Sequence, residues 1–168
     1  MEPLRRGLRM ILQPPIIDAG VGELFEVEIL VDAADAVAHL PMTLAFDPSV
    51  IEFESLRAGD FLGVEGDAEV VVNSTAPGIV VVGASRLRSS EGVSGSGSVA
   101  TMVFRAKKPG ETELSLARVE ALGAGLQPIA PLETWQALAV VHSSGEGSLS
   151  RGSAGVEAER SHSASQER

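Results

Sequence analysis

The sequence predicts an all-β fold, a β-sandwich built from nine short strands. Apolar and polar residues alternate with a period of two through most of the first 142 residues, which is the period of a half-buried strand. Turn-forming Pro and Gly residues recur at short intervals between the apolar runs. We find no convincing amphipathic helix and no repeat of 20–50 residues. These observations favour a jelly-roll-like antiparallel sandwich over a βαβ fold.

The first four expected strands lie in the first third of the chain. Met10–Leu12 is a short apolar run that ends before two prolines, and Phe25–Val31 alternates with glutamates on its outer face. Leu40–Phe46 alternates apolar and small or polar residues, and Ile51–Phe53 continues the pattern. Between these two strands, Asp47-Pro48 predicts a structural corner, since Pro restricts φ and Asp can cap the turn.

Five further strands are expected in the rest of the domain. They are Val70–Val72, Ile79–Ala84, Val99–Arg105, Leu114–Leu116 and Trp135–Val141. The turn Thr75-Ala76-Pro77-Gly78 separates the first two of these, and Lys108-Pro109-Gly110 precedes Leu114. The residues expected in the core are Phe25, Val27, Ile29, Leu44, Phe46, Phe53, Val80, Val82, Val103 and Leu116.

Composition divides the chain into three parts. Residues 8–142 carry the alternating pattern and are expected to form one domain. Residues 1–7 are expected to be a disordered N-terminus. Residues 143–168 are rich in Ser and Gly with few large apolar residues, which predicts a disordered tail because little surface can be buried there.

Charge and composition exclude several classes of function. The net charge of −10 argues against nucleic acid or an anionic membrane surface as partner. No apolar stretch approaches the ~20 residues of a membrane span, so no membrane insertion is expected. The absence of cysteine excludes disulfides and thiolate zinc sites. The N-terminal apolar run is short and no cleavage site follows it, so no signal peptide is predicted.

Short motifs give no catalytic or cofactor chemistry. Gly95–Ala100 matches the letters of a dinucleotide fingerprint, but a Gly/Ser loop precedes it and a strand-like run follows. His39, His142 and His162 have no metal-ligand spacing, and the acidic loop Gly59–Asp67 lacks the calcium-loop pattern. There is no nucleophile elbow. The sequence therefore predicts no enzyme, no cofactor and no metal site.

Three segments of the domain resemble the cohesin domain family. They are Phe46–Phe53 (FDPSVIEF), Gly59–Leu62 (GDFL) and Gly92–Ala106 (GVSGSGSVATMVFRA). The resemblance extends over roughly Leu8 to Val141, and the chain looks most like the cohesin-like modules that end some bacterial type II secretion secretins. It implies a nine-stranded sandwich and an extracellular or cell-envelope location.

The resemblance also implies a function in protein recognition. Cohesins of cellulose-degrading assemblies bind dockerin modules through one sheet face, so a non-catalytic docking module is the first hypothesis. The outward residues of the corresponding strands are His39, Pro41, Thr43, Val71, Asn73, Val81, Gly83, Ser85, Glu113 and Ser115. Cellulosomal cohesins tend to carry Asn and Asp on the third strand, where this chain has His39 and Pro41. The alternative is a carbohydrate-binding module linked to polysaccharide catabolism, for which Trp135 is the single candidate stacking platform.

Overall fold

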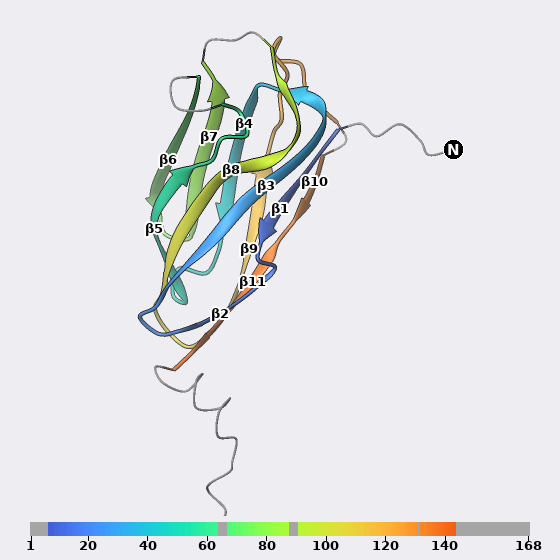
Figure 1. The fold of residues 1–168 in the computed structure, drawn as a ribbon. Helices are drawn as coiled ribbons and strands as arrows, with labels where there is room; N and C mark the ends of the chain where they lie inside the picture. The colour runs from blue at the N-terminus through green and yellow to red at the C-terminus, as the bar shows by residue number, and fades with distance from the viewer. Residues whose placement is uncertain (1–6, 64–66, 88–90, 131, 144–168) are drawn as a thin grey trace, which may run out of the picture.

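The computed structural model describes residues 7–63, 67–87, 91–130 and 132–143. These residues form eleven strands that are arranged as two packed sheets (Figure 1). The expected disordered segments 1–7 and 143–168 fall outside the described residues except for Gly7 and Ser143. The described ranges contain no helix, and so none that could cross a membrane.

The first sheet has five strands in the order β10-β1-β3-β8-β5. Their bounds are Leu132–Trp135 for β10, Leu8–Gln13 for β1, Leu24–Val37 for β3, Val93–Ala106 for β8 and Ile51–Ala58 for β5. The second sheet has six strands in the order β2-β11-β9-β4-β7-β6. Their bounds are Ile16–Gly20 for β2, Ala137–His142 for β11, Gly110–Val119 for β9, His39–Ala45 for β4, Ile79–Arg86 for β7 and Ala68–Ala76 for β6.

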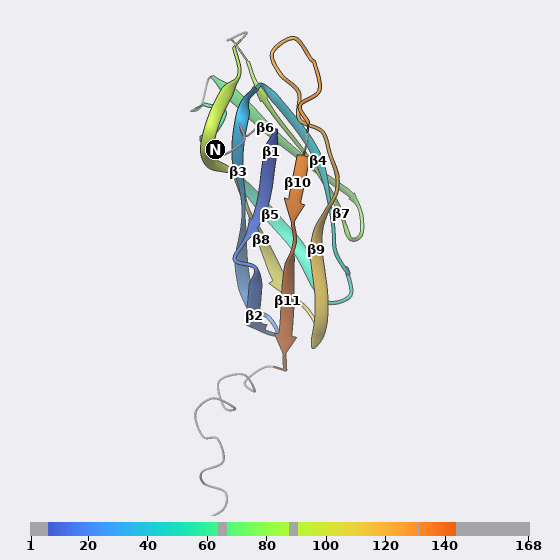
Figure 2. The same cartoon turned by 90° about the vertical axis from the view of Figure 1, so that its right-hand side faces the viewer.

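The all-β sandwich that the sequence predicts is confirmed, with two differences in detail. The structure has eleven strands instead of nine. The N-terminal segment and the C-terminal segment of the domain each cross from one sheet to the other, so each forms two strands (Figure 2). It passes from β1 to β2 across Pro14-Pro15, and from β10 to β11 across Gln136. The two crossing segments lie side by side, so β1 pairs with β10 in parallel and β2 pairs with β11 in parallel. The sandwich is therefore mixed instead of purely antiparallel.

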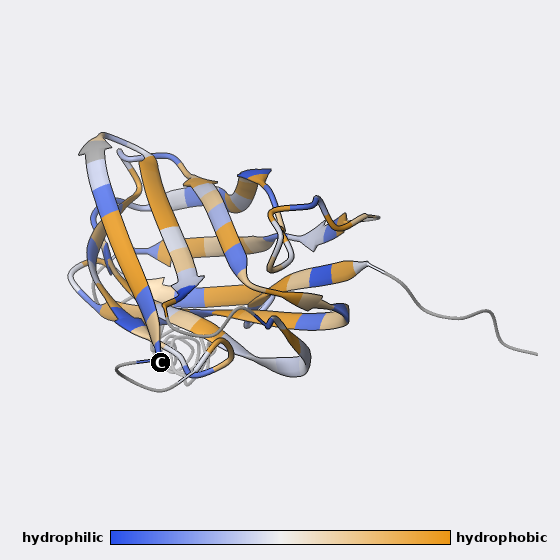
Figure 3. Ribbon diagram, turned by 90° about the horizontal axis from the view of Figure 1, so that it is seen from above, coloured by the Kyte–Doolittle hydropathy of each residue, from blue (hydrophilic) through white to orange (hydrophobic). Residues whose placement is uncertain are grey.

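Alternation along the strands separates the core from the two outer surfaces (Figure 3). Of the predicted core residues, Val27, Ile29, Leu44, Val80 and Val82 are buried. Phe25, Phe46, Phe53 and Leu116 are partly buried and pack against this core. Phe104 is fully buried among these phenylalanines. The Phe104 ring stacks on Phe25 and contacts the rings of Phe46 and Phe53 edge-on.

Val103 is the one predicted core residue that the structure contradicts. Met102 and Phe104 are fully buried, which turns Val103 to the outer surface, where it is half-buried. Strand β8 also begins at Val93 and includes the Gly/Ser stretch that the sequence predicts as a loop. The reason is long-range pairing: β8 is held between β3 and β5, and the register with β3 shifts near Ile29. The β-propensity of the Gly/Ser stretch does not indicate that it pairs with β3 and β5.

The Asp47-Pro48 corner is confirmed and is closed by local hydrogen bonds. One Asp47 carboxylate oxygen accepts bonds from the Ser49 amide (2.9 Å) and the Ser49 hydroxyl (2.7 Å). The Asp47 amide donates to the hydroxyl of Thr112, a buried polar side chain of β9 (2.8 Å). The bond to Thr112 thus connects the end of β4 to β9, its neighbour in the six-stranded sheet.

The hydrogen bonds at the corner predict how the pKa of Asp47 and the stability of the fold depend on Ser49. Hydrogen bonds from Ser49 to the carboxylate lower the pKa of Asp47. A lowered pKa stabilises the fold above the unfolded value, and this contribution is lost as the pH falls through the folded value. We expect Ser49→Ala to raise the pKa of Asp47, because the hydroxyl donor is removed while the amide donor stays. A carboxyl titration by NMR measures this, and an unchanged Asp47 pKa would contradict the assigned cause.

Candidate functional site

The ten residues that the sequence places on a binding face lie on the outer surface of the six-stranded sheet. Strand β7 is the middle strand of this region, paired with β4 on one side and with β6 on the other. The pairing aligns the outward residues in three rows across the strands. The rows are His39–Ser85–Glu69, Pro41–Gly83–Val71 and Thr43–Val81–Asn73. We call the eight predicted residues in these rows the docking patch; Glu69 borders it.

The direction of these side chains follows from the alternation in β4 and β7. Leu40, Met42 and Leu44 are buried between the sheets, as are Val80 and Val82. The residues between them must then point away from the core, since successive side chains of a strand point to opposite faces. The docking patch is therefore a consequence of how the core is filled.

The centre of the docking patch is apolar and open to solvent. Val71 is 54% exposed and Val81 is 46% exposed, and Pro41 beside them is also exposed. His39 and Ser85 close one end of the docking patch, where the His39 Nδ1 and Ser85 Oγ atoms share a hydrogen bond of 3.2 Å. The arrangement offers apolar contact in the middle and hydrogen-bonding groups at the edge.

The two predicted residues of β9 lie outside these rows. Ser115 is opposite Ala45, one row beyond Thr43. Glu113 is further along β9, beyond the end of β4, where its partner is Leu138 of β11. The structure therefore brings eight of the ten residues into one docking patch, with Ser115 next to it and Glu113 apart.

Three charged neighbours were missed at the level of sequence. Glu69 lies two residues before Val71 on the same strand. Alternation would have predicted Glu69 as outward if the expected strand Val70–Val72 had been extended by one residue at its start. Arg118 is opposite Thr43 because a bulge in β9 skips Ala117, and no local signal marks this bulge. Glu120 follows β9, and its amide donates to the Pro41 carbonyl (3.0 Å), which places it opposite Pro41.

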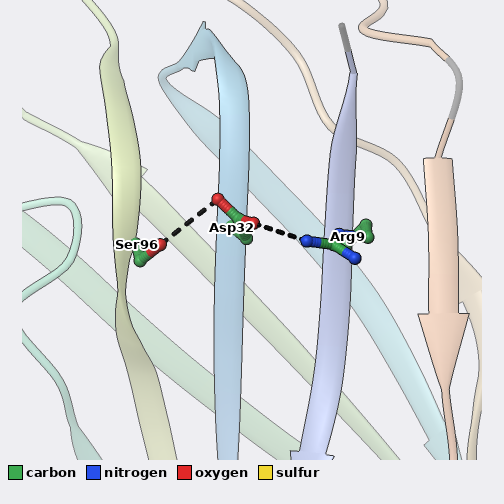
Figure 4. A network of polar contacts seen from close by, with 3 residues as sticks. All are labelled: Arg9, Asp32 and Ser96. Atoms are coloured by element: carbon green, nitrogen blue, oxygen red, sulfur yellow. Dashed lines mark hydrogen bonds and ion pairs between the residues drawn. The ribbon is translucent and has the colours of Figure 1, made fainter. Parts of the chain in front are cut away.

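The outer surface of the five-stranded sheet has a different character. Arg9, Asp32 and Ser96 form a chain of polar contacts across β1, β3 and β8 (Figure 4). Ion pairs Arg57–Glu26 (3.1 Å) and Arg105–Glu54 (2.9 Å) cross the same sheet. Six charged side chains of this surface are thus paired within the chain. Trp135 is 55% exposed at its edge, on β10 opposite Ile11.

The docking patch consists of apolar and hydrogen-bonding groups. Within residues 7–63, 67–87, 91–130 and 132–143, no three His, Cys, Asp or Glu side chains gather as a metal site would require. The two described histidines have different partners: His39 bonds Ser85 and His142 bonds Asp18, while His162 lies outside the described residues.

Comparison with known proteins points to one family. The family model for the cohesin domain matches residues 13–131, which is more than half of the chain. No curated protein matches the chain in sequence. Several solved structures share its fold at low sequence identity.

One such structure is a non-cellulosomal cohesin from the archaeon Archaeoglobus fulgidus, with a TM-score of 0.68 and 20% identity over 87% of this chain and 98% of that one. A cohesin–dockerin complex from Clostridium thermocellum has a TM-score of 0.68 and 13% identity over 85% and 98%. The sixth cohesin of scaffoldin B from Acetivibrio cellulolyticus, in complex with a Cel5 dockerin, has a TM-score of 0.68 and 15% identity over 81% and 99%. The chain belongs to the cohesin domain family.

Proposed function

We propose that this chain is a non-catalytic docking module that binds a dockerin-like protein through the docking patch. The observation that carries the proposal is the exposed apolar centre formed by Pro41, Val71 and Val81. Contiguous exposed apolar surface is uncommon on monomeric proteins and marks interaction sites. Family membership supports the same reading, since two of the similar structures are cohesins bound to dockerins.

The contrast between the two outer surfaces favours this sheet as the docking side. On the five-stranded sheet, cross-strand ion pairs satisfy charged side chains internally. A partner there would have to displace or desolvate those pairs, which opposes binding. On the docking patch, Val71 and Val81 can lose contact with water without such a cost.

The proposal is tested by Val81→Asp. The variant puts a carboxylate into the apolar centre, where a bound partner would desolvate it, so we expect at least a roughly tenfold loss of affinity. The melting temperature should stay nearly unchanged, because Val81 is half exposed and contributes little to the core. The measurement is capture of dockerin modules and of the host's secreted proteins on immobilised protein, with calorimetry of the same samples.

Leu24→Asp is the matched control. Leu24 is 54% exposed and lies at the start of β3 in the other sheet, so the same chemical change occurs away from the docking patch. We expect it to leave capture unchanged. Unchanged capture by Val81→Asp would show that binding occurs elsewhere, and a large fall in melting temperature would show that Val81 packs in the core.

Polysaccharide binding remains the second candidate. The observation in its favour is the half-exposed ring of Trp135 beside Ile11, since flat apolar sugar faces stack on exposed aromatic rings. A pull-down on insoluble polysaccharide, run with Trp135→Ala as its control, separates the two functions. Retention that depends on Trp135, together with no capture of protein, would replace the docking proposal. The resemblance to secretin modules stays a prediction and assigns no partner.

A further inference from the structure

An open cleft lies at one lateral edge of the sandwich, between β5 and β6. These strands are the last strands of their two sheets and lie on the same side of the molecule (Figure 1). The cleft has a volume of about 320 Å³, which is enough for a small organic molecule. We call it the edge cleft; its lining includes Phe46, Ile51, Phe53, Ser74, Ala76 and Lys107.

The floor of the edge cleft is apolar and partly aromatic. The rings of Phe46 and Phe53 contact the fully buried Phe104 ring, with ring centres 5.2 Å and 5.8 Å away, yet both are only partly buried. Ile51 is fully buried beside them. Part of each of the two rings is therefore left at the cleft. An apolar group that enters the cleft would contact this aromatic surface and release the water on it.

Both edge strands depart from regular pairing beside the edge cleft. The register of β5 with β8 shifts between Phe53 and Ser55. The register of β6 with β7 shifts between Asn73 and Ala76. β-bulges bend the strand that carries them and are over-represented next to active sites. The edge cleft is therefore bordered by two bends of the backbone, one from each sheet.

One ammonium group lies at the rim of the edge cleft. Lys107 and Lys108 are the only lysines in a chain with a net charge of −10. The Lys107 Nζ atom donates to the Pro48 carbonyl oxygen (3.0 Å), which holds the ammonium at the corner after β4. An ammonium has three N–H donors, so two are left after this bond. A carboxylate suits these donors best, because a charge-assisted hydrogen bond is stronger than a neutral one.

Glu52 limits how tightly an anion can bind in the edge cleft. It is the only acidic side chain among the described residues that line the cleft. Glu52 is exposed and lies opposite Arg105 in the pairing of β5 with β8, which offsets part of its repulsion of an anion. Lys107, in contrast, is held at the rim by its hydrogen bond. The balance of charge favours an anion over a cation.

We infer that the edge cleft binds a small apolar carboxylate, with its apolar body on Phe46 and Phe53 and its carboxylate on Lys107. The inference goes beyond the proposed docking function, because the ligand is a small molecule and no residue of the docking patch lines the cleft. Ala76→Phe should fill the cleft and prevent binding. Ala76 is exposed, so the melting temperature of this variant should stay nearly unchanged.

The test is a calorimetric titration of the full chain with three probes that share one apolar body. The probes are phenylpropionate, phenylpropanol and phenylpropylamine. We expect a dissociation constant of about 1 mM or lower for phenylpropionate, and binding that is at least about tenfold weaker for the other two. The alcohol lacks the charge that Lys107 would bind, and the amine would be repelled by it.

Variants of the two lysines and of Glu52 test the assigned charges. Lys107→Met should weaken phenylpropionate by about tenfold and leave phenylpropanol unchanged. Glu52→Gln should strengthen phenylpropionate, because it removes the repelling carboxylate. Lys108→Met is the matched control: it removes the same charge one residue along the chain, and Lys108 does not line the cleft. We expect it to bind phenylpropionate as the wild type does.

Four results would overturn the inference. They are no binding of phenylpropionate at about 10 mM, tighter binding of the amine than of the carboxylate, equal weakening by Lys107→Met and Lys108→Met, and full binding by Ala76→Phe. Ala117→Phe adds the same ring at an exposed position of β9 outside the cleft, and it should bind like the wild type. None of the probes is a protein, so the outcome is independent of the capture experiment above.

Discussion

Replacing Phe104 with alanine is expected to lower the free energy of unfolding by about 3–5 kcal/mol. Phe104 is fully buried, and its ring centre lies 5.7 Å from that of Phe25, 5.2 Å from that of Phe46 and 5.8 Å from that of Phe53. The three partners come from β3, β5 and the corner after β4, so they cannot all move into the space that alanine leaves. The loss therefore combines lost burial with a cavity.

Val103→Ala is the matched control for this prediction. Val103 is the preceding residue on β8 but points to the outer surface, where it is half-buried, so we expect a loss of about 1 kcal/mol or less. Urea unfolding followed by tryptophan fluorescence and by circular dichroism measures both variants. Equal losses for Val103→Ala and Phe104→Ala would contradict the inward and outward assignment of β8.

Gly78→Ala is expected to be the second most damaging change, with a loss of about 2–4 kcal/mol. Gly78 has a φ of 77°, in the region that side chains disfavour. A Cβ atom there would also lie 2.6 Å from the Phe46 carbonyl oxygen and 2.9 Å from the Pro48 Cδ atom. Relief is blocked because the Gly78 carbonyl accepts a hydrogen bond from the Phe46 amide.

Gly22→Ala separates the cost of the positive φ angle from the cost of the steric clash. Gly22 has a φ of 92°, yet a Cβ atom there would have no neighbour within 4 Å. It should therefore show the conformational cost alone, about 1 kcal/mol. The difference between the two variants in thermal or urea unfolding reports the steric cost of approaching the corner. Equal losses at both positions would show that Gly78 is required for its φ angle only.

Much of the docking patch could be predicted from the sequence because alternation is a local property. Once Leu40, Leu44, Val80 and Val82 are assigned to the core, the residues between them must face outward. The same reasoning fails at Val103. Because Met102, Val103 and Phe104 are all apolar, alternation allows either Val103 or its two neighbours to face the core, and only the pairing of β8 with β3 and β5 decides which. It also fails at Arg118, which a bulge turns toward Thr43.

By itself, the sequence determined the all-β class, the Asp47-Pro48 corner and the outward residues of β4 and β7, because each depends on side-chain period or on turn chemistry within a few residues. The tertiary structure decided which strands are neighbours. The parallel pairs β1–β10 and β2–β11, and the rows that place Gly83 between Pro41 and Val71, join segments far apart in the chain. Backbone hydrogen bonds of this kind are chemically alike for every strand, so the choice among partners is made by how the whole core packs.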